Sequence, residues 1–398
     1  MNREDFSIFN NTDIIYFDNN ATSLKPDIVL DSIKDYYTKY TANAHRGDYK
    51  TSHKVDTLYE DTRSLIKDFI NAKDSKEIVF TYGCTDSLNM IVNGFFKNKL
   101  KKDDEVILTK TEHASNILPW MKLEKEIGIK IIYAPLDKDL KLNIENLNKV
   151  ITNKTKVISL AHVTNTIGDV RDLESIGKLC KEKDIYFVVD AAQSAGHKKI
   201  DVQKNNISFL AFSGHKMLGP TGIGILYGKY NFLEETDPVR TGGGMNTYFE
   251  ENSYEYKLPP HKLEAGTPNI EGVLGLKTAV EYLNKIGLDK IEKHELELKD
   301  YLLDRLNKID NIKVINPNTE SSNILFNING VFPQDTAVYL DHYNICVRAG
   351  NHCAKLLKDE LGIKNTCRIS LYLYNNKEEI DILIEALEKS ENIFEVVI

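Results

Sequence analysis

Residues 186–193 of the chain read YFVVDAAQ, a short run of aromatic and β-branched residues followed by an aspartate, two alanines and a glutamine. A strand that is apolar on both faces is typical of a parallel sheet buried between layers of helices. Runs of the same kind flank it, separated by helical patterns, at residues 77–81, 105–108, 129–133, 157–161, 209–213 and 224–227. This alternation predicts an α/β fold with a large, mostly parallel sheet.

The length of the chain predicts two domains, because 398 residues exceed the usual size of a single core. We expect a large domain at residues 16–284 and a smaller α+β domain formed by residues 1–15 and 285–398. A long helical region after Gly272 is expected to bridge the two. Residues 246–260 are expected to form a long surface excursion.

Composition and charge exclude several classes of function. The formal net charge of −8 and the pI near 5.8 argue against a nucleic-acid-binding protein, which usually carries a basic excess. No run approaches the roughly twenty apolar residues that span a bilayer, and the N-terminus lacks the apolar core of a signal peptide, so we expect a cytoplasmic protein without a membrane segment. The five cysteines are widely spaced and include no C-x-x-C pair, which argues against a disulfide framework and a zinc site.

Polar residues follow the predicted strands at the points where the strands end. In a parallel α/β sheet, ligands bind at the carboxyl ends of the strands. Cys84 and Thr85 follow the first strand and precede a helix, where free N–H groups and the Thr85 hydroxyl can hold a phosphate. Polar residues also lie at or shortly after the ends of the later strands. In chain order they are His113, Asn165, Asp190 with Gln193, and Ser213 with His215 and Lys216.

This set meets the needs of pyridoxal 5′-phosphate (PLP), which requires a lysine, a carboxylate at its ring nitrogen, a stacking group and a phosphate site. We expect the Schiff base on Lys216 and the ring nitrogen at Asp190. The other expected contacts are Asn165 and Gln193 at the ring oxygen, His113 stacked on the ring, and Thr85, Ser213 and His215 at the phosphate. Each residue alone is most often a cap or a surface charge, but their order on successive strands predicts a PLP enzyme.

The same residues resemble a known family, the class V aminotransferase group of fold-type I PLP enzymes. Within it, the chain is most similar to the SUF-type (group II) cysteine desulfurases and selenocysteine-lyase-like proteins. The resemblance covers nearly the whole chain. Its most specific motifs lie at residues 16–21, 44–47, 112–113, 162–165, 190–193, 213–222, 264–269 and 348–354.

The resemblance implies roles for individual residues. It makes Lys216 the Schiff-base lysine, Cys353 the nucleophile that accepts sulfur, and His113 a proton shuttle. It makes Arg368 the contact of the substrate carboxylate, because a guanidinium group binds a carboxylate in a bidentate manner. Further implied contacts are Arg348, Asn165 and His45 at the substrate, and Thr267 at the cofactor phosphate of a neighbouring subunit, which implies a homodimer.

The implied reaction converts L-cysteine to L-alanine and leaves a persulfide on Cys353, for iron–sulfur cluster assembly or other sulfur traffic through a small SUF-type acceptor protein. The chain departs from the family at Asn351, where a histidine is usual, and at Cys84, where a threonine is frequent. A neighbouring imidazole such as His352 could help to ionise the Cys353 thiol.

Two alternatives stay open. One is a selenocysteine lyase or a related class V aminotransferase. The other is a fold relative without catalytic activity, although such a protein is expected to have lost Lys216 or Asp190, and both are present.

Overall fold

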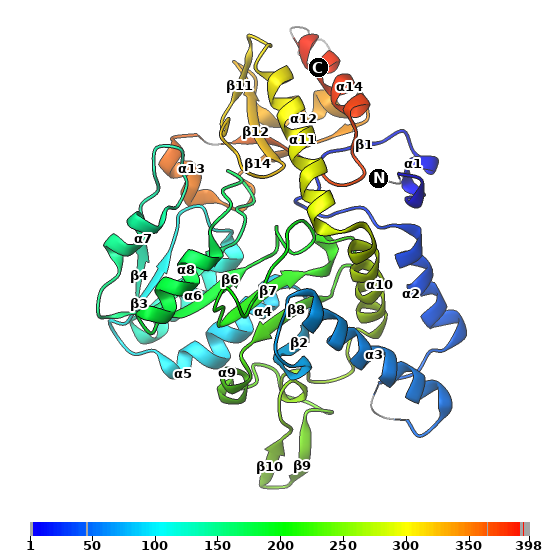
Figure 1. The fold of residues 1–398 in the computed structure, drawn as a ribbon, viewed down its shortest axis with the longest axis vertical. Coiled ribbons are helices and arrows are strands. Elements are labelled where there is room, and N and C mark those ends of the chain that lie inside the picture. The colour runs from blue at the N-terminus through cyan, green and yellow to red at the C-terminus, as the bar shows by residue number, and fades with distance from the viewer. Residues whose placement is uncertain (1–2, 45–46, 364, 391–392, 394–398) are drawn as a thin grey trace.

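The computed structural model describes residues 3–44, 47–363, 365–390 and 393. Its largest sheet has seven strands in the order β2-β8-β7-β6-β5-β3-β4 (Figure 1). They are β2 (Ile78–Thr81), β3 (Glu105–Leu108), β4 (Lys130–Tyr133), β5 (Thr155–Ala161), β6 (Tyr186–Asp190), β7 (Phe209–Ser213) and β8 (Gly224–Gly228). β8 alone runs opposite to the other six strands of this sheet. The predicted α/β fold with a mostly parallel sheet is therefore confirmed.

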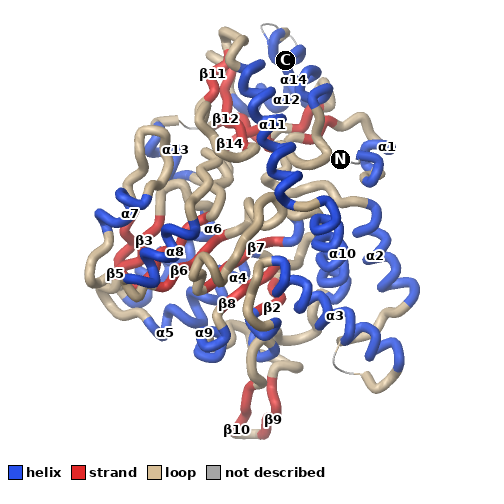
Figure 2. The backbone as a smooth tube through the Cα atoms, in the orientation of Figure 1, coloured by secondary structure: helices blue, strands red, loops and turns tan. Residues whose placement is uncertain are grey.

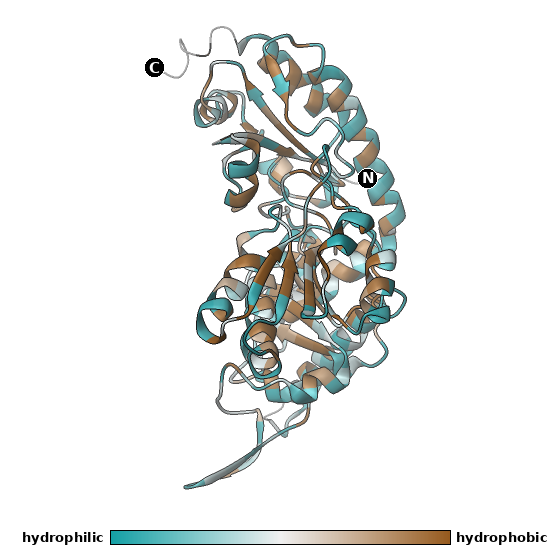
Figure 3. Ribbon diagram, turned by 90° about the vertical axis from the view of Figure 1, so that its left-hand side faces the viewer, coloured by the Kyte–Doolittle hydropathy of each residue, from teal (hydrophilic) through white to brown (hydrophobic). Residues whose placement is uncertain are grey.

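The large sheet is buried on both faces because successive residues of a strand point in opposite directions. In β2, Ile78 and Phe80 belong to one apolar cluster, while Val79 between them belongs to another. The first cluster includes residues of α2 (Asp27–Lys39), α3 (Lys50–Phe69), α8 (Leu173–Glu182) and α10 (Ile270–Ile286), and the second includes residues of α4 (Cys84–Ile91) and α6 (Ala114–Ile127). Helices thus surround the central strands (Figure 2), which are largely hydrophobic (Figure 3).

Further helices are α1 (Ile8–Asn11), α5 (Lys97–Lys99), α7 (Ile144–Val150), α9 (Tyr230–Glu235), α11 (Leu288–Leu306), α12 (Pro333–Asp341), α13 (Lys355–Leu361) and α14 (Lys377–Glu388). Short 3₁₀ or π segments occur at Arg3–Asp5, Ser75–Glu77, Val92–Phe96, Gly214–Lys216 and His261–Leu263. Among the helices of the described residues, none is both long enough and apolar enough to cross a membrane.

A second, antiparallel sheet has the order β11-β12-β15-β14. It consists of β11 (Ile312–Val314), β12 (Asn323–Ile328), β14 (Arg348–Gly350) and β15 (Thr366–Ser370). The second sheet has its own apolar core, in which Cys367 and Ile369 of β15 are fully buried together with residues of α14. Beside it, β1 (Ile15–Tyr16) pairs with β13 (Ile345–Cys346), so a segment near the N-terminus joins the C-terminal part of the chain. The expected domain boundaries stay a prediction.

The helical region expected after Gly272 consists of two helices. α10 ends at Ile286 and α11 begins at Leu288. Gly287 between them has a φ of 92°, which a glycine adopts without the steric penalty of a Cβ atom. The chain turns there, and α11 crosses from the large sheet to the second sheet (Figure 1).

Residues 246–260, the expected surface excursion, contain a hairpin of β9 (Asn246–Glu250) and β10 (Ser253–Tyr256). Most of its residues are exposed. The hairpin projects away from the body of the molecule in both orientations (Figures 1 and 3).

Candidate active site

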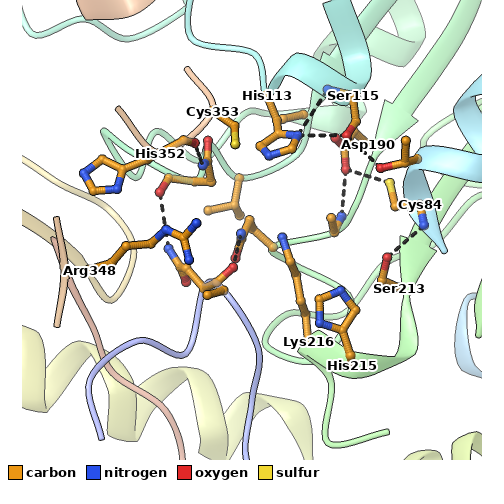
Figure 4. Close-up of a pocket in the computed structure, with 18 of the residues that line it drawn as sticks. Cys84, His113, Ser115, Asp190, Ser213, His215, Lys216, Arg348, His352 and Cys353 are labelled. Atoms are coloured by element: carbon orange, nitrogen blue, oxygen red, sulfur yellow. Dashed lines mark hydrogen bonds between the residues drawn. The ribbon is translucent and has the colours of Figure 1, made fainter. Parts of the chain in front are cut away.

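A cavity of about 260 Å³ lies where the carboxyl ends of the large sheet face the second sheet. Every predicted site residue that the structure describes lines this cavity, with the exception of Thr267. The lining set includes Cys84, Thr85, His113, Asn165, Asp190, Gln193, Ser213, His215, Lys216, Arg348, Cys353 and Arg368. Figure 4 shows the labelled members of this set around one space. Thr267 is exposed, with its Oγ1 3.5 Å from Asn43 Nδ2, and His45 lies outside the described residues.

Lys216 ends the short turn that follows β7. Gly214 begins this turn, and a Cβ atom there would lie 2.9 Å from Cγ2 of Ile223, so the turn is closely packed. The pKa of Lys216 is lowered, mainly because burial disfavours the charged amine, although Asp190 acts in the opposite direction. A neutral amine in this position can serve as a nucleophile or as a base.

Asp190 ends β6 and is held by two donors on one of its oxygens. Its Oδ1 accepts hydrogen bonds from Ala192 N at 2.9 Å and from Cys84 Sγ at 3.2 Å. Burial raises the pKa of the Cys84 thiol, and Asp190 raises it further, so the thiol keeps its proton and donates it to the carboxylate. Both bonds use Oδ1, and Oδ2 can therefore serve a cationic group in the cavity.

Hydroxyl groups and a helix N-terminus gather around one part of the cavity. α4 begins at Cys84, whose backbone N donates to Ser213 Oγ at 2.8 Å. Thr85 Oγ1 lies 2.7 Å from Ser115 Oγ. The pKa of His215 is lowered to about 4, mainly by burial and then by Lys216, so its ring is neutral at pH 7. Hydroxyl groups beside a helix N-terminus favour an anion such as a phosphate.

His113 is the N-cap of α6, and its ring orientation follows from that position. Its Nδ1 accepts from the backbone N of Ser115 at 3.2 Å. Because a backbone N–H can only donate, the neutral ring carries its proton on Nε2. Burial and then Lys216 lower the pKa of His113, so the neutral form is favoured. The ring can therefore donate a hydrogen bond through Nε2.

Two arginines of the second sheet face the cavity. Arg368 is 2% exposed, and its Nη atoms donate to Asn165 O at 2.9 Å and to Asp18 Oδ1 at 3.1 Å. Its Nε is buried and lacks a partner in the described part of the chain. Burial lowers the pKa of Arg368 to about 10, which still leaves the group charged at pH 7. Arg348 is more exposed and lies 3.7 Å from Asp18 Oδ2.

Cys353 is an exposed residue of the loop between β14 and α13. Its carbonyl accepts from Ala114 N at 2.9 Å, which fixes the loop to the start of α6 beside His113. Its own N donates to Asn351 Oδ1 at 3.1 Å, so the asparagine that departs from the family pattern bonds to the loop backbone.

The His352 ring points away from the Cys353 thiol (Figure 4). Its Nε2 bonds Thr366 Oγ1 at 2.9 Å. The pKa of His352 is lowered to about 2, mainly by burial and then by Arg368. The suggestion that His352 helps to ionise the thiol is therefore wrong for this geometry.

Cys180 and Cys367 are buried, as expected of structural cysteines, whereas Cys346 is only half-buried.

Sequence reasoning missed the buried ion pair behind His113. Glu112 and Arg171 are both fully buried, with Oε1 and Nη1 2.5 Å apart. The Glu112 carboxylate also accepts from the backbone N of Ala161 at the end of β5. A charged residue shortly after a buried strand, in the Glu112-His113 motif, was the only available sign. The pair joins the segment that carries His113 to the neighbouring strand.

Residues 15–383 match the aminotransferase class-V family, so the chain belongs to this family. A probable cysteine desulfurase of Halalkalibacterium halodurans is 43% identical over 385 residues, covering 97% of this chain and 95% of the relative. A probable cysteine desulfurase of Ureaplasma parvum is 44% identical over 382 residues, covering 96% and 94%. The apo structure of the cysteine desulfurase from Thermococcus onnurineus NA1 matches with a TM-score of 0.93 at 38% identity, covering 97% of this chain and 96% of that one. The predicted class V family and its fold are thus confirmed.

Proposed function

We propose that the chain is a PLP-dependent cysteine desulfurase, which converts L-cysteine to L-alanine and takes up the sulfur on Cys353. The observation that carries the proposal is that a single cavity holds Lys216, Asp190, His113 and Cys353 (Figure 4). The names of the relatives support the sulfur chemistry.

The lining residues fit PLP. Asn165 Oδ1 is a buried acceptor without a hydrogen-bond partner in the described part of the chain, as a site for a ring hydroxyl requires. Asp190 Oδ2 would pair the ring nitrogen, and the hydroxyl groups near the start of α4 would hold the phosphate. The remaining proposed contacts are Gln193 at the ring oxygen, His113 on the ring face, and Thr85, Ser213 and His215 at the phosphate. When bound, PLP supplies an aldehyde carbon for the amine and a ring that accepts electrons from the substrate α-carbon.

Arg368 would orient the substrate through its carboxylate. Two of its donors are already used by Asn165 O and Asp18, but the unpaired Nε and the remaining Nη hydrogens still form a fork. A carboxylate there satisfies the buried Nε. We assign secondary substrate contacts to Arg348, Asn165 and His45.

Lys216 would move the α-proton of the substrate, and His113 would assist through a hydrogen bond. The lowered pKa of Lys216 shifts its equilibrium toward the free amine, which would remove the α-proton of the substrate. His113 would donate a hydrogen bond from its Nε2–H to the reacting groups. The Cys353 thiolate attacks the substrate sulfur, and the electron pair of the breaking carbon–sulfur bond stays with the carbon, which is then protonated. The products are L-alanine and a Cys353 persulfide, so atoms and electrons balance.

The test is to supply PLP and L-cysteine, measure alanine and sulfide, and locate the persulfide by mass spectrometry. Cys353→Ala should lower alanine formation by roughly 10²-fold or more, because it removes the nucleophile. Cys346→Ala is the matched control, since Cys346 is a partly accessible cysteine outside the cavity, and it should keep full activity. Undiminished alanine formation by Cys353→Ala would refute the thiol role. Cleavage of selenocysteine by that variant would point to a selenocysteine lyase, and a keto-acid product to an aminotransferase.

We further propose a cytoplasmic homodimer that passes sulfur to a small SUF-type acceptor protein for iron–sulfur cluster assembly. The exposed position of Thr267 outside the cavity is compatible with a contact to the cofactor phosphate of a second subunit. The two separate sheets support a large domain at residues 16–284 and a small one at residues 1–15 and 285–398. Sedimentation equilibrium tests the dimer, and Thr267→Ala should weaken PLP binding in it.

A further inference from the structure

Lys358 is a buried lysine close to the loop that carries Cys353. It lies on α13 and is 5% exposed, whereas Lys355 on the same helix is exposed. Its Nζ donates to the carbonyl of Gly350 and lies 3.5 Å from Thr366 Oγ1. Both acceptors are uncharged, and no ion pair joins Lys358 to a carboxylate in the described part of the chain. Lysine is almost never fully buried without a carboxylate, so this placement points to a specific task.

The two acceptors of Lys358 mark the two ends of the Cys353 loop. Gly350 and Thr366 pair across β14 and β15. The chain leaves the second sheet at Gly350, passes Cys353 and α13, and returns at Thr366. The Lys358 ammonium group therefore reaches back from α13 and bonds both ends of the loop on which it lies.

The backbone at Cys353 needs such support. His352 and Cys353 have φ values of 51° and 57°, a left-handed conformation that is unfavourable for residues with a Cβ atom. Residues in this conformation keep it only where their surroundings hold them. The Thr366 hydroxyl, which Lys358 approaches, also bonds the His352 ring. Thr366 thus links the ammonium group to the residue directly before Cys353.

We propose that Lys358 is a positioning residue, whose buried ammonium group fixes the loop so that the Cys353 thiol faces the cavity. The inference rests on the proposed function for the role of Cys353 itself. Burial lowers the pKa of Lys358 to about 8, with the Cys367 thiol acting in the opposite direction. The amine is therefore still mainly charged at pH 7, and its bond to the Gly350 carbonyl is charge-assisted.

The test compares Lys358→Met with Lys355→Met in the PLP-loaded full chain. Methionine fills the buried space and lacks the charge. In Lys358→Met, the amides of Cys353 and Ala354 should exchange with deuterium about tenfold faster, and a single turnover should form the Cys353 persulfide about tenfold more slowly, because the thiol is less well placed. The L-cysteine concentration that half-saturates the change in cofactor absorbance should stay within about twofold. The melting temperature should change little, since losing the bonds to Gly350 O and Thr366 Oγ1 is offset by removing a buried charge that has no carboxylate partner among the described residues.

Lys355→Met should behave as the unmodified chain in all four measurements, because its side chain is exposed. Equal exchange and persulfide rates in the two variants would overturn the proposal. A lower melting temperature in Lys358→Met, with substrate binding and persulfide formation reduced together, would also overturn it, because that pattern indicates a structural role only.

Thr366→Val is a second variant that removes the hydroxyl group between Lys358 and His352. It should also speed the exchange of the two amides. If the unmodified chain forms no persulfide on Cys353, the proposed function fails. The exchange comparison still decides whether Lys358 holds the loop.

Discussion

Replacing Glu112 by alanine should lower the free energy of unfolding by about 3 kcal/mol. Glu112 and Arg171 are both fully buried, and the carboxylate also accepts from Ala161 N at 2.7 Å and Asn116 Nδ2 at 2.9 Å. Removing one member of a buried pair costs about 3–5 kcal/mol, because the other charge stays buried without its partner. We expect the lower end of this range, since Asp169 Oδ2 remains 3.3 Å from Arg171 Nε.

Guanidinium unfolding followed by circular dichroism measures this loss. The matched control is Asp289→Ala, which breaks the exposed pair with Lys199, whose side chains are 72% and 69% exposed. Exposed pairs contribute about 0–1 kcal/mol, so the control should change the unfolding free energy by less than about 1 kcal/mol. A loss in Glu112→Ala no larger than that of the control would refute the assignment of Glu112 as a buried anchor of the segment that carries His113.

Two further predictions concern stability. Burial and then the nearby Lys198 lower the pKa of His162 to about 3, whereas its pKa in the unfolded chain is about 6.5. Between these two pH values the unfolded chain binds more protons than the folded chain, so the free energy of unfolding decreases as the pH falls. His162→Asn should therefore lose less stability than the unmodified chain between pH 7 and pH 5 in urea unfolding, and equal losses would contradict this. Gly177→Ala should destabilise α8 by about 1–3 kcal/mol although alanine favours helices, because the new Cβ atom would lie 1.8 Å from Asn205 O. A raised melting temperature in that variant would show that the helix can shift.

Much of the fold could be predicted because the decisive patterns are local. Strands β3, β6 and β7 occupy the predicted residues, since a buried strand must be apolar on both faces. The break at Gly287 was missed because the apolar spacing continues across it. A single left-handed residue leaves no trace in the periodicity of side chains.

The sequence by itself determined which residues of the large sheet surround the cavity, including Lys216 and Asp190, because parallel strands bring their carboxyl ends to one edge of the sheet. Only the tertiary structure decided how those residues are paired. The Cys84 thiol bonds Asp190, which lies 106 residues away, and the His352 ring turns toward Thr366 and away from Cys353. The direction of a loop side chain depends on backbone angles and on partners distant in the chain. No local pattern of residues records either of them.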